Sequence, residues 1–193
     1  AVSKTFKIDH ILPLIAHGHL DYGENKVQEA LEKWSKIKKD KKDINLHLIG
    51  KLQTNKVKFA IGIFDYIHSL DSEKLANELS KRQNEKGKSL NYFIQINLGS
   101  EEQKGGLEIN DLKNFHDHCI NKLNLSILGL MAIPPNDNKP EKYFQKITEL
   151  NKRFNFQTWL SLCEAQLIKF PDWQGKWWRK NEGNYTTSAN LSL

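Results

Sequence analysis

Short apolar segments alternate with amphipathic segments along most of the chain, and this alternation constrains the fold more than any other feature. The apolar segments have the length and composition of buried strands and recur every ~20 to 35 residues. The segments between them carry apolar residues at helical spacing, as in 8–16, 26–37 and 140–154. Repeated strand–helix units predict an α/β fold with a parallel sheet. The expected strands lie at 1–5, 19–25, 45–50, 66–70, 92–98 and 125–133, with a seventh at 157–162.

The strand at 92–98 indicates which kind of parallel sheet this is. Its two faces differ, because one carries Ile94, Ile96 and Leu98 and the other carries Phe93, Gln95 and Asn97. In a barrel of parallel strands the outer face packs against helices, and the inner face becomes polar toward the carboxyl-terminal rim. An antiparallel strand with one solvated face would show the same alternation. The helices between the strands favour the barrel, so we predict a TIM-type (β/α) barrel.

The chain has 193 residues, whereas a complete eight-stranded barrel takes about 250. We therefore expect an incomplete barrel, with strand 1 clipped and strand 8 missing. The sequence divides into a barrel domain at 1–158 and a divergent tail at 159–193, where four of the five tryptophans lie. The abrupt change in composition suggests that the tail is disordered or out of frame. The chain also begins inside an expected strand and without Met, which suggests a fragment that has no signal peptide.

The net charge of +6 comes mainly from lysine, which is densest at 36–42. A basic run of this kind can bind nucleic acid through phosphate contacts, but lysines also stabilise the carboxyl end of a helix. No RNA-binding aromatic motif or helix-turn-helix pattern accompanies the run, so nucleic-acid binding is the weaker interpretation. No apolar run approaches the ~20 residues of a membrane span. Cys119 and Cys163 lack metal-ligand spacing and indicate reduced thiols in a cytoplasmic protein.

The first five residues put a lysine on the same strand face as an apolar residue. Along a strand, Val2 and Lys4 share one side, and Ala1 and Ser3 share the other. Burial disfavours the charged amine and lowers its pKa, which leaves a nucleophile that can form a Schiff base with a carbonyl compound. The alternative is a lysine at a strand end that extends its amine into water. From these residues alone, the alternative is the more common outcome.

Five segments, in order along the chain, carry a resemblance to one protein family. They are Ala-Val-Ser-Lys-Thr at 1–5, Tyr-Gly-Glu-Asn-Lys-Val-Gln-Glu at 22–29, His-Leu-Ile-Gly-Lys-Leu-Gln-Thr-Asn-Lys at 47–56, Glu-Glu-Gln-Lys-Gly-Gly at 101–106 and Gly-Leu-Met-Ala-Ile-Pro at 129–134. Over 1–155 the chain resembles the pyridoxal phosphate homeostasis protein family, whose fold is similar to the N-terminal barrel of alanine racemase.

The resemblance implies roles for individual residues. Lys4 matches the lysine that holds pyridoxal 5′-phosphate as an internal aldimine, and Asn25 matches a residue beside the cofactor ring. Met131 and Ile133 share a strand face and could pack against the ring, although core packing is the usual role of such side chains. His47 is expected to point into the barrel, where a buried, hydrogen-bonded histidine and a ligand contact are equally good interpretations.

The resemblance also implies a function: a cytoplasmic, monomeric protein that binds pyridoxal 5′-phosphate and maintains its level, with cofactor-dependent apoenzymes as recipients. No metal and no robust catalytic activity are expected. A racemase-like enzyme is the alternative, but racemases of this fold need a second acid–base residue, commonly a tyrosine from a further domain. The family's late motifs, Ser-Met-Gly-Met-Ser and Arg-Ile-Gly, do not occur in this sequence. Because loops after strands seven and eight usually anchor the phosphate in such barrels, we expect weak cofactor binding and low stability.

Overall fold

The computed structural model describes residues 2–99, 105–134, 140–156, 158–163 and 185–188. These residues form a seven-stranded sheet whose strands follow one another in chain order. Neighbouring strands from β1 to β6 are parallel, and β7 is antiparallel to β6. The strands are β1 (Asp21–Glu24), β2 (Asn45–Leu48), β3 (Tyr66–Leu70), β4 (Asn91–Ile96), β5 (Ser126–Ala132), β6 (Thr158–Cys163) and β7 (Tyr185–Ser188).

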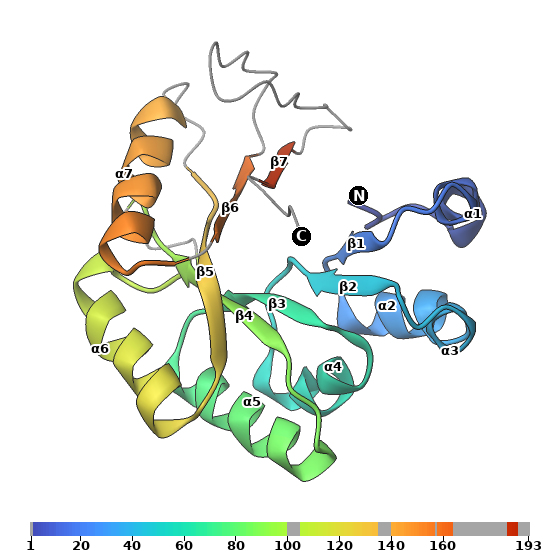
Figure 1. Ribbon diagram of the computed structural model, residues 1–193, viewed down its shortest axis with the longest axis horizontal. Coiled ribbons are helices and arrows are strands. Elements are labelled where there is room, and N and C mark those ends of the chain that lie inside the picture. The colour runs from blue at the N-terminus through green and yellow to red at the C-terminus, as the bar shows by residue number, and fades with distance from the viewer. Residues whose placement is uncertain (1, 100–104, 135–139, 157, 164–184, 189–193) are drawn as a thin grey trace.

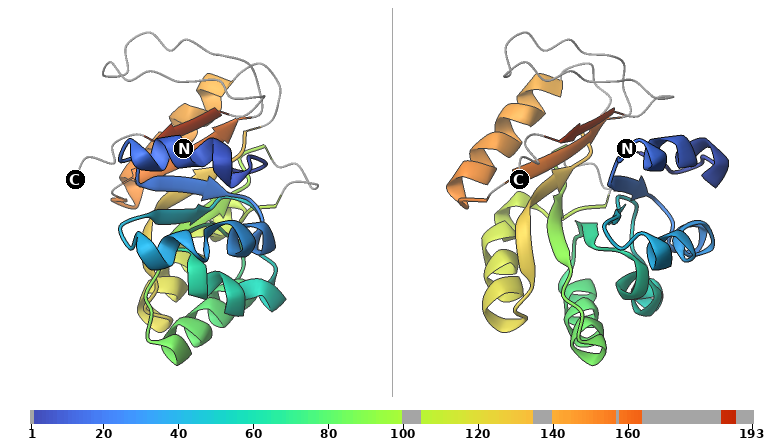
Figure 2. Two further views of the ribbon diagram at one scale, coloured as in Figure 1. Left: turned by 90° about the vertical axis from the view of Figure 1, so that its right-hand side faces the viewer. Right: turned by 45° about the vertical axis from the view of Figure 1, so that its right-hand side comes forward.

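Helices connect the parallel strands and lie on the outer side of the curved sheet (Figure 1; Figure 2). A curved parallel sheet with an outer layer of helices is the architecture that the strand–helix alternation predicts, and it makes the fold α/β and TIM-barrel-like. The helices are α1 (Ile8–Ala16), α2 (Val27–Trp34), α3 (Ile37–Asp40), α4 (Val57–Ile63), α5 (Glu73–Lys86), α6 (Leu112–Asp117) and α7 (Pro140–Arg153), with short 3-10 turns at Thr54–Lys56 and Ile109–Asp111 and a π-helical turn at His118–Lys122.

The two faces of β4 have the environments that its alternating sequence predicts. Ile94 and Ile96 are buried in the core between the sheet and the helices. On the other face, the Phe93 ring stacks on the His68 ring of β3, with ring centroids 4.4 Å apart. Gln95 shares the face of Phe93 and is also buried. The prediction of an apolar outer face and a more polar inner face is therefore confirmed for this strand.

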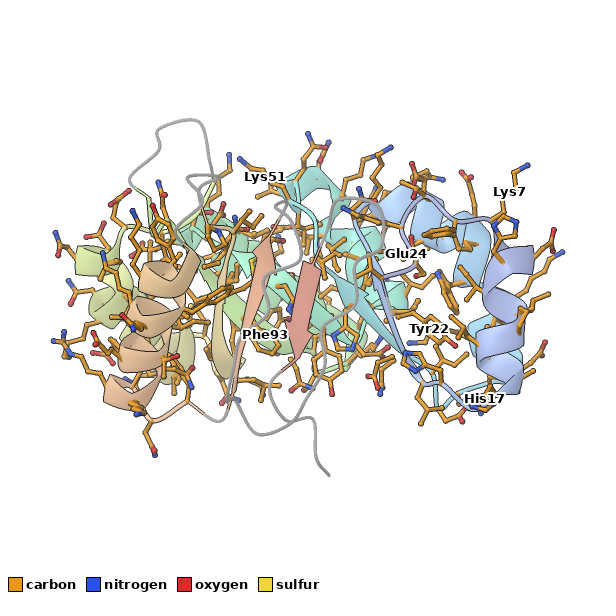
Figure 3. The ribbon with its side chains drawn as sticks, turned by 90° about the horizontal axis from the view of Figure 1, so that it is seen from above. Lys7, His17, Tyr22, Glu24, Lys51 and Phe93 are labelled. Atoms are coloured by element: carbon orange, nitrogen blue, oxygen red, sulfur yellow. The ribbon has the colours of Figure 1, made fainter. Side chains whose placement is uncertain are left out.

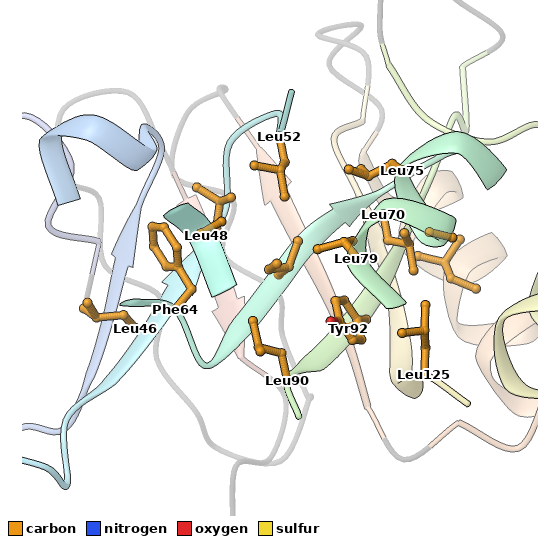
Figure 4. Packing of buried hydrophobic residues seen from close by; sticks show 14 of the residues in the cluster. Leu46, Leu48, Leu52, Phe64, Leu70, Leu75, Leu79, Leu90, Tyr92 and Leu125 are labelled. Atoms are coloured by element: carbon orange, nitrogen blue, oxygen red, sulfur yellow. The ribbon is translucent and has the colours of Figure 1, made fainter. Parts of the chain in front are cut away.

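The main core fills the layer between the sheet and the helices (Figure 4). Trp34 of α2 is fully buried there and packs against Tyr22 of β1, with ring centroids 4.7 Å apart. Burying one large apolar side chain stabilises a fold by about 1.5–3 kcal/mol, so this layer holds the helices on the sheet. Its fully buried leucines include Leu46, Leu48, Leu70 and Leu79.

The first residues differ from the expected strand. Val2 makes a single parallel bridge to Gly23, and Lys4 lies in a turn. The amides of Ser3 and Lys4 both donate to the carbonyl oxygen of Gly23, at 2.9 and 3.1 Å. Two successive amides on one acceptor cannot continue a strand ladder, because ladder bonds use alternate residues of each strand. The chain then turns away at Thr5, whose φ is 69°.

The described part of the tail contains two strands. β6 (Thr158–Cys163) agrees with the strand expected at 157–162. β7 (Tyr185–Ser188) was not expected, because its sequence shows no strand or helix period. The rest of the expected tail, 164–184 and 189–193, lies outside the described residues. Among the helices of the described residues, none combines the length and the hydropathy that a bilayer crossing requires.

Candidate functional site

The sheet aligns the residues at the start of the chain with those of its neighbouring strands. Val2 bridges Gly23 of β1, and Gly23 is in register with His47 of β2. Side chains on neighbouring parallel strands point the same way when they are in register. Lys4 and Asn25 come two residues after Val2 and Gly23, at the carboxyl ends of these paired segments, and the Lys4 amide donates to the Gly23 carbonyl oxygen.

Ser3, the residue before Lys4, is held on the helix side of the sheet. Glu24 contacts Lys33 and Trp34 of α2, so its carboxylate lies on the helix side of the sheet. The Ser3 hydroxyl donates to Glu24 Oε1 at 2.6 Å and therefore lies on the same side. Lys4 follows Ser3 directly, lies in the turn at the edge of the sheet and is partly exposed.

Asn25 offers an acceptor at this rim. Its Oδ1 is buried and has no hydrogen-bond partner among the described residues. Buried polar atoms nearly always have a partner, so an unpaired one at this rim fits a ligand that carries a hydrogen-bond donor. The loop after β2 lies against the same residue, since a Cβ on Gly50 would come within 2.2 Å of the Asn25 carbonyl oxygen. Only glycine allows so close an approach of the two backbones.

His47 is in register with Gly23, two residues before Asn25. Its ring forms hydrogen bonds with Asp21 and His68 inside the barrel. Its Nε2 is 3.1 Å from Asp21 Oδ1, and its Nδ1 is 3.0 Å from His68 Nε2. The ring also stacks on Tyr66, with centroids 4.2 Å apart. Both ring nitrogens therefore have protein partners, which supports a buried, hydrogen-bonded histidine over a direct ligand contact.

The hydrogen bonds among Asp21, His47 and His68 fix the tautomers of the two histidines. The Asp21 carboxylate only accepts, so His47 Nε2 donates to it, and a neutral His47 accepts at Nδ1 from His68 Nε2. The hydrogen bond from His47 lowers the pKa of Asp21. Burial, followed by the nearby His47, lowers the pKa of His68 well below its ordinary value. His68 is therefore a neutral imidazole whose Nδ1 has no partner among the described residues.

Met131 and Ile133 lie on another part of the barrel wall. Met131 is fully buried on β5 and is in register with Gln95 of β4, whose amide donates to the Gly105 carbonyl oxygen at 2.9 Å. Ile133 follows β5 toward the rim and is half-buried. In the sheet order β2, β3 and β4 separate β5 from β1, and the curvature turns the inner faces of β1 and β5 toward each other (Figure 2).

The residues that hold Ser3 were not identified from the sequence. Glu24 is fully buried on β1 beside Tyr22, where the strand meets α2 (Figure 3). Its Oε1 accepts hydrogen bonds from Ser3, from Lys33 at 2.9 Å and from Trp34 Nε1 at 2.9 Å. The available signal was the two-residue spacing of Tyr22 and Glu24, which puts a carboxylate on a core face. We call Ser3, Glu24, Lys33 and Trp34 the Glu24 cluster.

Comparison with protein families gives a match over most of the chain. The family described as "Alanine racemase, N-terminal domain" matches residues 1–172. The pyridoxal phosphate homeostasis protein of Aquifex aeolicus is 42% identical over 151 residues, which are 77% of this chain and 65% of that protein. The corresponding protein of Synechocystis is 35% identical over 170 residues, with 86% of this chain and 78% of that protein covered. This chain thus spans slightly less than two thirds of the Aquifex relative.

Solved structures give the same result. PipY of Synechococcus elongatus, in a structure described as having PLP bound, has a TM-score of 0.71 and 31% identity, with 82% of this chain and 78% of that chain covered. Alanine racemase from Streptomyces coelicolor matches with a TM-score of 0.64 at 14% identity and covers 84% of this chain and 46% of its own, which shows the fold alone. The family expected from the sequence motifs is confirmed: this chain belongs to the pyridoxal phosphate homeostasis protein family, which carries the alanine racemase N-terminal domain.

Proposed function

We propose that this chain binds pyridoxal 5′-phosphate at the carboxyl-terminal rim of its strands, with Lys4 as the covalent anchor. The observation that carries the proposal is that the backbone of Lys4 is bonded to Gly23, two residues before Asn25, whose buried Oδ1 has no partner among the described residues. A primary amine and an unpaired acceptor at the same rim suit a ligand with an aldehyde and a polar ring. PipY, a relative of this chain, has been solved with this cofactor.

Each proposed residue has a separate task. The bound cofactor would supply an aldehyde carbon, and Lys4 would supply the amine that attaches to it. Asn25 Oδ1 would accept a hydrogen bond from a polar group of the ring. Met131 and Ile133 would give the ring an apolar surface on the β5 side of the barrel. His47 would stabilise the strands beneath the cofactor without contacting it, because both of its ring nitrogens already have protein partners.

We further propose that the protein holds the cofactor and passes it to apoenzymes, and that it turns over amino acids poorly. A racemase needs a second acid–base group at the ring. The tyrosines on the described strands β1, β3 and β4 serve elsewhere: Tyr22 and Tyr92 are buried in the core, and Tyr66 stacks on His47. We therefore take the likeness to alanine racemases as a shared fold and propose storage and transfer of the cofactor over turnover of amino acids.

The remaining parts of the proposal concern the barrel, the location and the assembly. We take the curved sheet as a TIM-type barrel in which the strand pairs of the described residues run from Val2 to β7 without joining the two ends. We also propose a monomer in the cytoplasm. Cys119 is a free thiol, which suits a reducing compartment, and burial raises its pKa to about 12.

The test compares Lys4→Ala with Lys7→Ala, which removes an exposed lysine three residues away (Figure 3). Pyridoxal 5′-phosphate is added to each protein, and absorption, equilibrium binding and covalent labelling after borohydride reduction are recorded. We expect the native chain and Lys7→Ala to show an absorption band and a labelled peptide containing Lys4, and Lys4→Ala to show neither. An unchanged band in Lys4→Ala would overturn the proposal.

Further measurements separate the alternatives. Racemisation of alanine by the loaded protein would favour an enzyme. Salt-sensitive retention of RNA without cofactor binding would favour a role for the lysine run at 36–42, although Lys38 of that run pairs with Asp65 inside the fold. Because the family's late motifs do not occur in the sequence, we expect the Kd for the cofactor to be weaker than about 1 μM.

A further inference from the structure

Each polar group of Ser3 takes part in a hydrogen bond. Its amide donates to the Gly23 carbonyl oxygen at 2.9 Å, and its hydroxyl donates to Glu24 Oε1 at 2.6 Å. Its own carbonyl oxygen accepts from Lys33 Nζ at 3.0 Å. Lys33 Nζ also donates to both oxygens of Glu24, at 2.9 and 3.1 Å. The ion pair therefore holds Ser3 from two sides, through the hydroxyl and through the carbonyl.

The Glu24 cluster is costly to build. The side chain of Glu24 is 0% exposed and that of Lys33 only 12% exposed. Removing two charges from water carries a large desolvation penalty, and an apolar pair of similar volume often stabilises a fold equally well. A buried ion pair of this kind is better explained by the geometry that it imposes than by stability alone. The geometry imposed here is that of Ser3.

The segment that Ser3 belongs to has few other restraints. Val2 makes one bridge, and the next two amides share a single acceptor on Gly23. At Thr5 the chain turns away with a positive φ. Without the Glu24 cluster, the backbone of Lys4 would depend on the hydrogen bonds to Gly23, on the bridge of Val2 and on the turn in which the Phe6 amide donates to the Ser3 carbonyl oxygen at 3.3 Å. Strand ends with so few bonds open readily in solution.

We propose that the Glu24 cluster is the positioning device for Lys4. It fixes Ser3 on the helix side of the sheet, and because Lys4 is the next residue, the turn that carries its amine starts from a fixed point beside Gly23. Glu24 and Lys33 act through the backbone of Ser3 and do not need to touch the amine of Lys4. This inference rests on the proposed function of Lys4 as the cofactor anchor.

The test uses Ser3→Ala, Ser3→Thr and Glu24→Gln, with Glu29→Gln as the matched control. Glu29 lies in α2, the helix of Lys33, and forms an exposed ion pair with Lys26, the residue just before that helix. The first readout needs no cofactor: the hydrogen-exchange protection of the Lys4 amide, together with thermal melting. The second readout is the pyridoxal 5′-phosphate Kd and the pH midpoint of the absorption band of the bound cofactor.

We expect Ser3→Ala and Glu24→Gln to lower Lys4 amide protection and cofactor affinity by about tenfold each, because a charge-assisted hydrogen bond is lost. The pH midpoint of the band should shift in the same variants. Ser3→Thr keeps the hydroxyl and should restore both quantities, and Glu29→Gln should match the native chain. If Glu24→Gln fails to fold, the comparison of Ser3→Ala with Ser3→Thr still tests the inference.

Other outcomes would overturn the inference. Ser3→Ala with Lys4 amide protection and a Kd within about twofold of the native values would show that the cluster only stabilises the fold. A loss of affinity in Ser3→Ala that Ser3→Thr does not reverse would also count against it. An absorption band that survives in Lys4→Ala defeats the proposed function instead, and amide protection in the cofactor-free protein still tests the cluster.

Discussion

His47 Nδ1 and His68 Nε2 lie 3.0 Å apart on neighbouring strands inside the barrel. The other ring nitrogen of His47 bonds to Asp21. Aromatic rings cover both histidines, since Tyr66 stacks on His47 and Phe93 stacks on His68. Burial and the neighbouring imidazole lower the pKa of His68 well below its ordinary value. A proton on His68 would be a buried charge next to a second histidine, so the folded protein keeps this ring neutral.

The neutral His68 makes stability depend on pH. The pKa of His68 is lower in the folded state than in the unfolded state, so below pH ~6.5 the unfolded chain takes up a proton that the folded chain does not. The free energy of unfolding should therefore fall as pH drops from 6.5 to 5, by at most about 1.4 kcal/mol per pH unit for this one group. His68→Phe should flatten this slope in urea titrations at several pH values.

The same pH range is free of the Asp21 contribution. The pKa of Asp21 is lowered by its bond to His47, so its stabilisation is present above its ordinary value of 3.8 and is lost only as pH falls below it. Ile67→Val, a mild core change on the same strand, should lower stability equally at every pH. If the free energy of unfolding of His68→Phe depends on pH as steeply as that of the native chain, a neutral His68 is not the cause of the dependence.

Gly50→Ala should disturb the proposed site directly. The added Cβ would lie 2.2 Å from the Asn25 carbonyl oxygen, so one of the two backbones must move. We expect the variant to lose about 1–3 kcal/mol of unfolding free energy through overpacking, and to bind pyridoxal 5′-phosphate more weakly because Asn25 is displaced. Chemical denaturation and equilibrium binding measure the two effects.

Gly62→Ala is the matched control for that change. Gly62 lies in α4, and an added Cβ would be 3.4 Å from the flexible Nζ of Lys86. Alanine is a better helix former than glycine by about 0.5–1 kcal/mol, so this variant should be as stable as the native chain or more stable. Equal losses of stability in both glycine variants would show that the contact with Asn25 is not the cause.

A buried hydrogen bond joins Tyr92 of β4 to Gln83 of α5. The Tyr92 hydroxyl donates to Gln83 Oε1 at 2.8 Å, and both side chains are buried. Tyr92→Phe leaves that oxygen without its donor and should cost about 1–3 kcal/mol of stability in urea denaturation. Adding Gln83→Leu removes the unpaired group, so the double variant should cost less than the sum of the single changes. Strict additivity would show that the bond contributes nothing.

The apolar layer between sheet and helices predicts a large difference between two leucines. Leu48 is fully buried on β2 (Figure 4), whereas Leu12 of α1 is 46% exposed. Leu48→Ala should lower the free energy of unfolding by about 2–5 kcal/mol through lost contacts and a cavity. Leu12→Ala should change it by about 0.5 kcal/mol or less. Similar losses in both variants, measured by chemical denaturation, would show that the layer does not hold the sheet.

Much of this architecture follows from local patterns in the sequence. The spacing of apolar residues decides which side of an element turns away from water, and it does so within a few residues. The α/β fold, the polar inner face at Gln95 and the outer face at Ile94 and Ile96 could all be predicted on that basis. Ordered motifs were enough to identify the family, and the match to Lys4 singled out one amine among many lysines.

The tertiary structure alone decided how those residues are held. Ser3 and Glu24 are 21 residues apart in the chain, as are His47 and His68, and no local pattern encodes which partners such distant groups will find. The same holds for the unexpected turn at Lys4, since two amides converge on one carbonyl of a neighbouring strand. Hydrogen bonds between remote residues depend on sheet register and curvature, and these are fixed only when the whole layer of helices packs onto the strands.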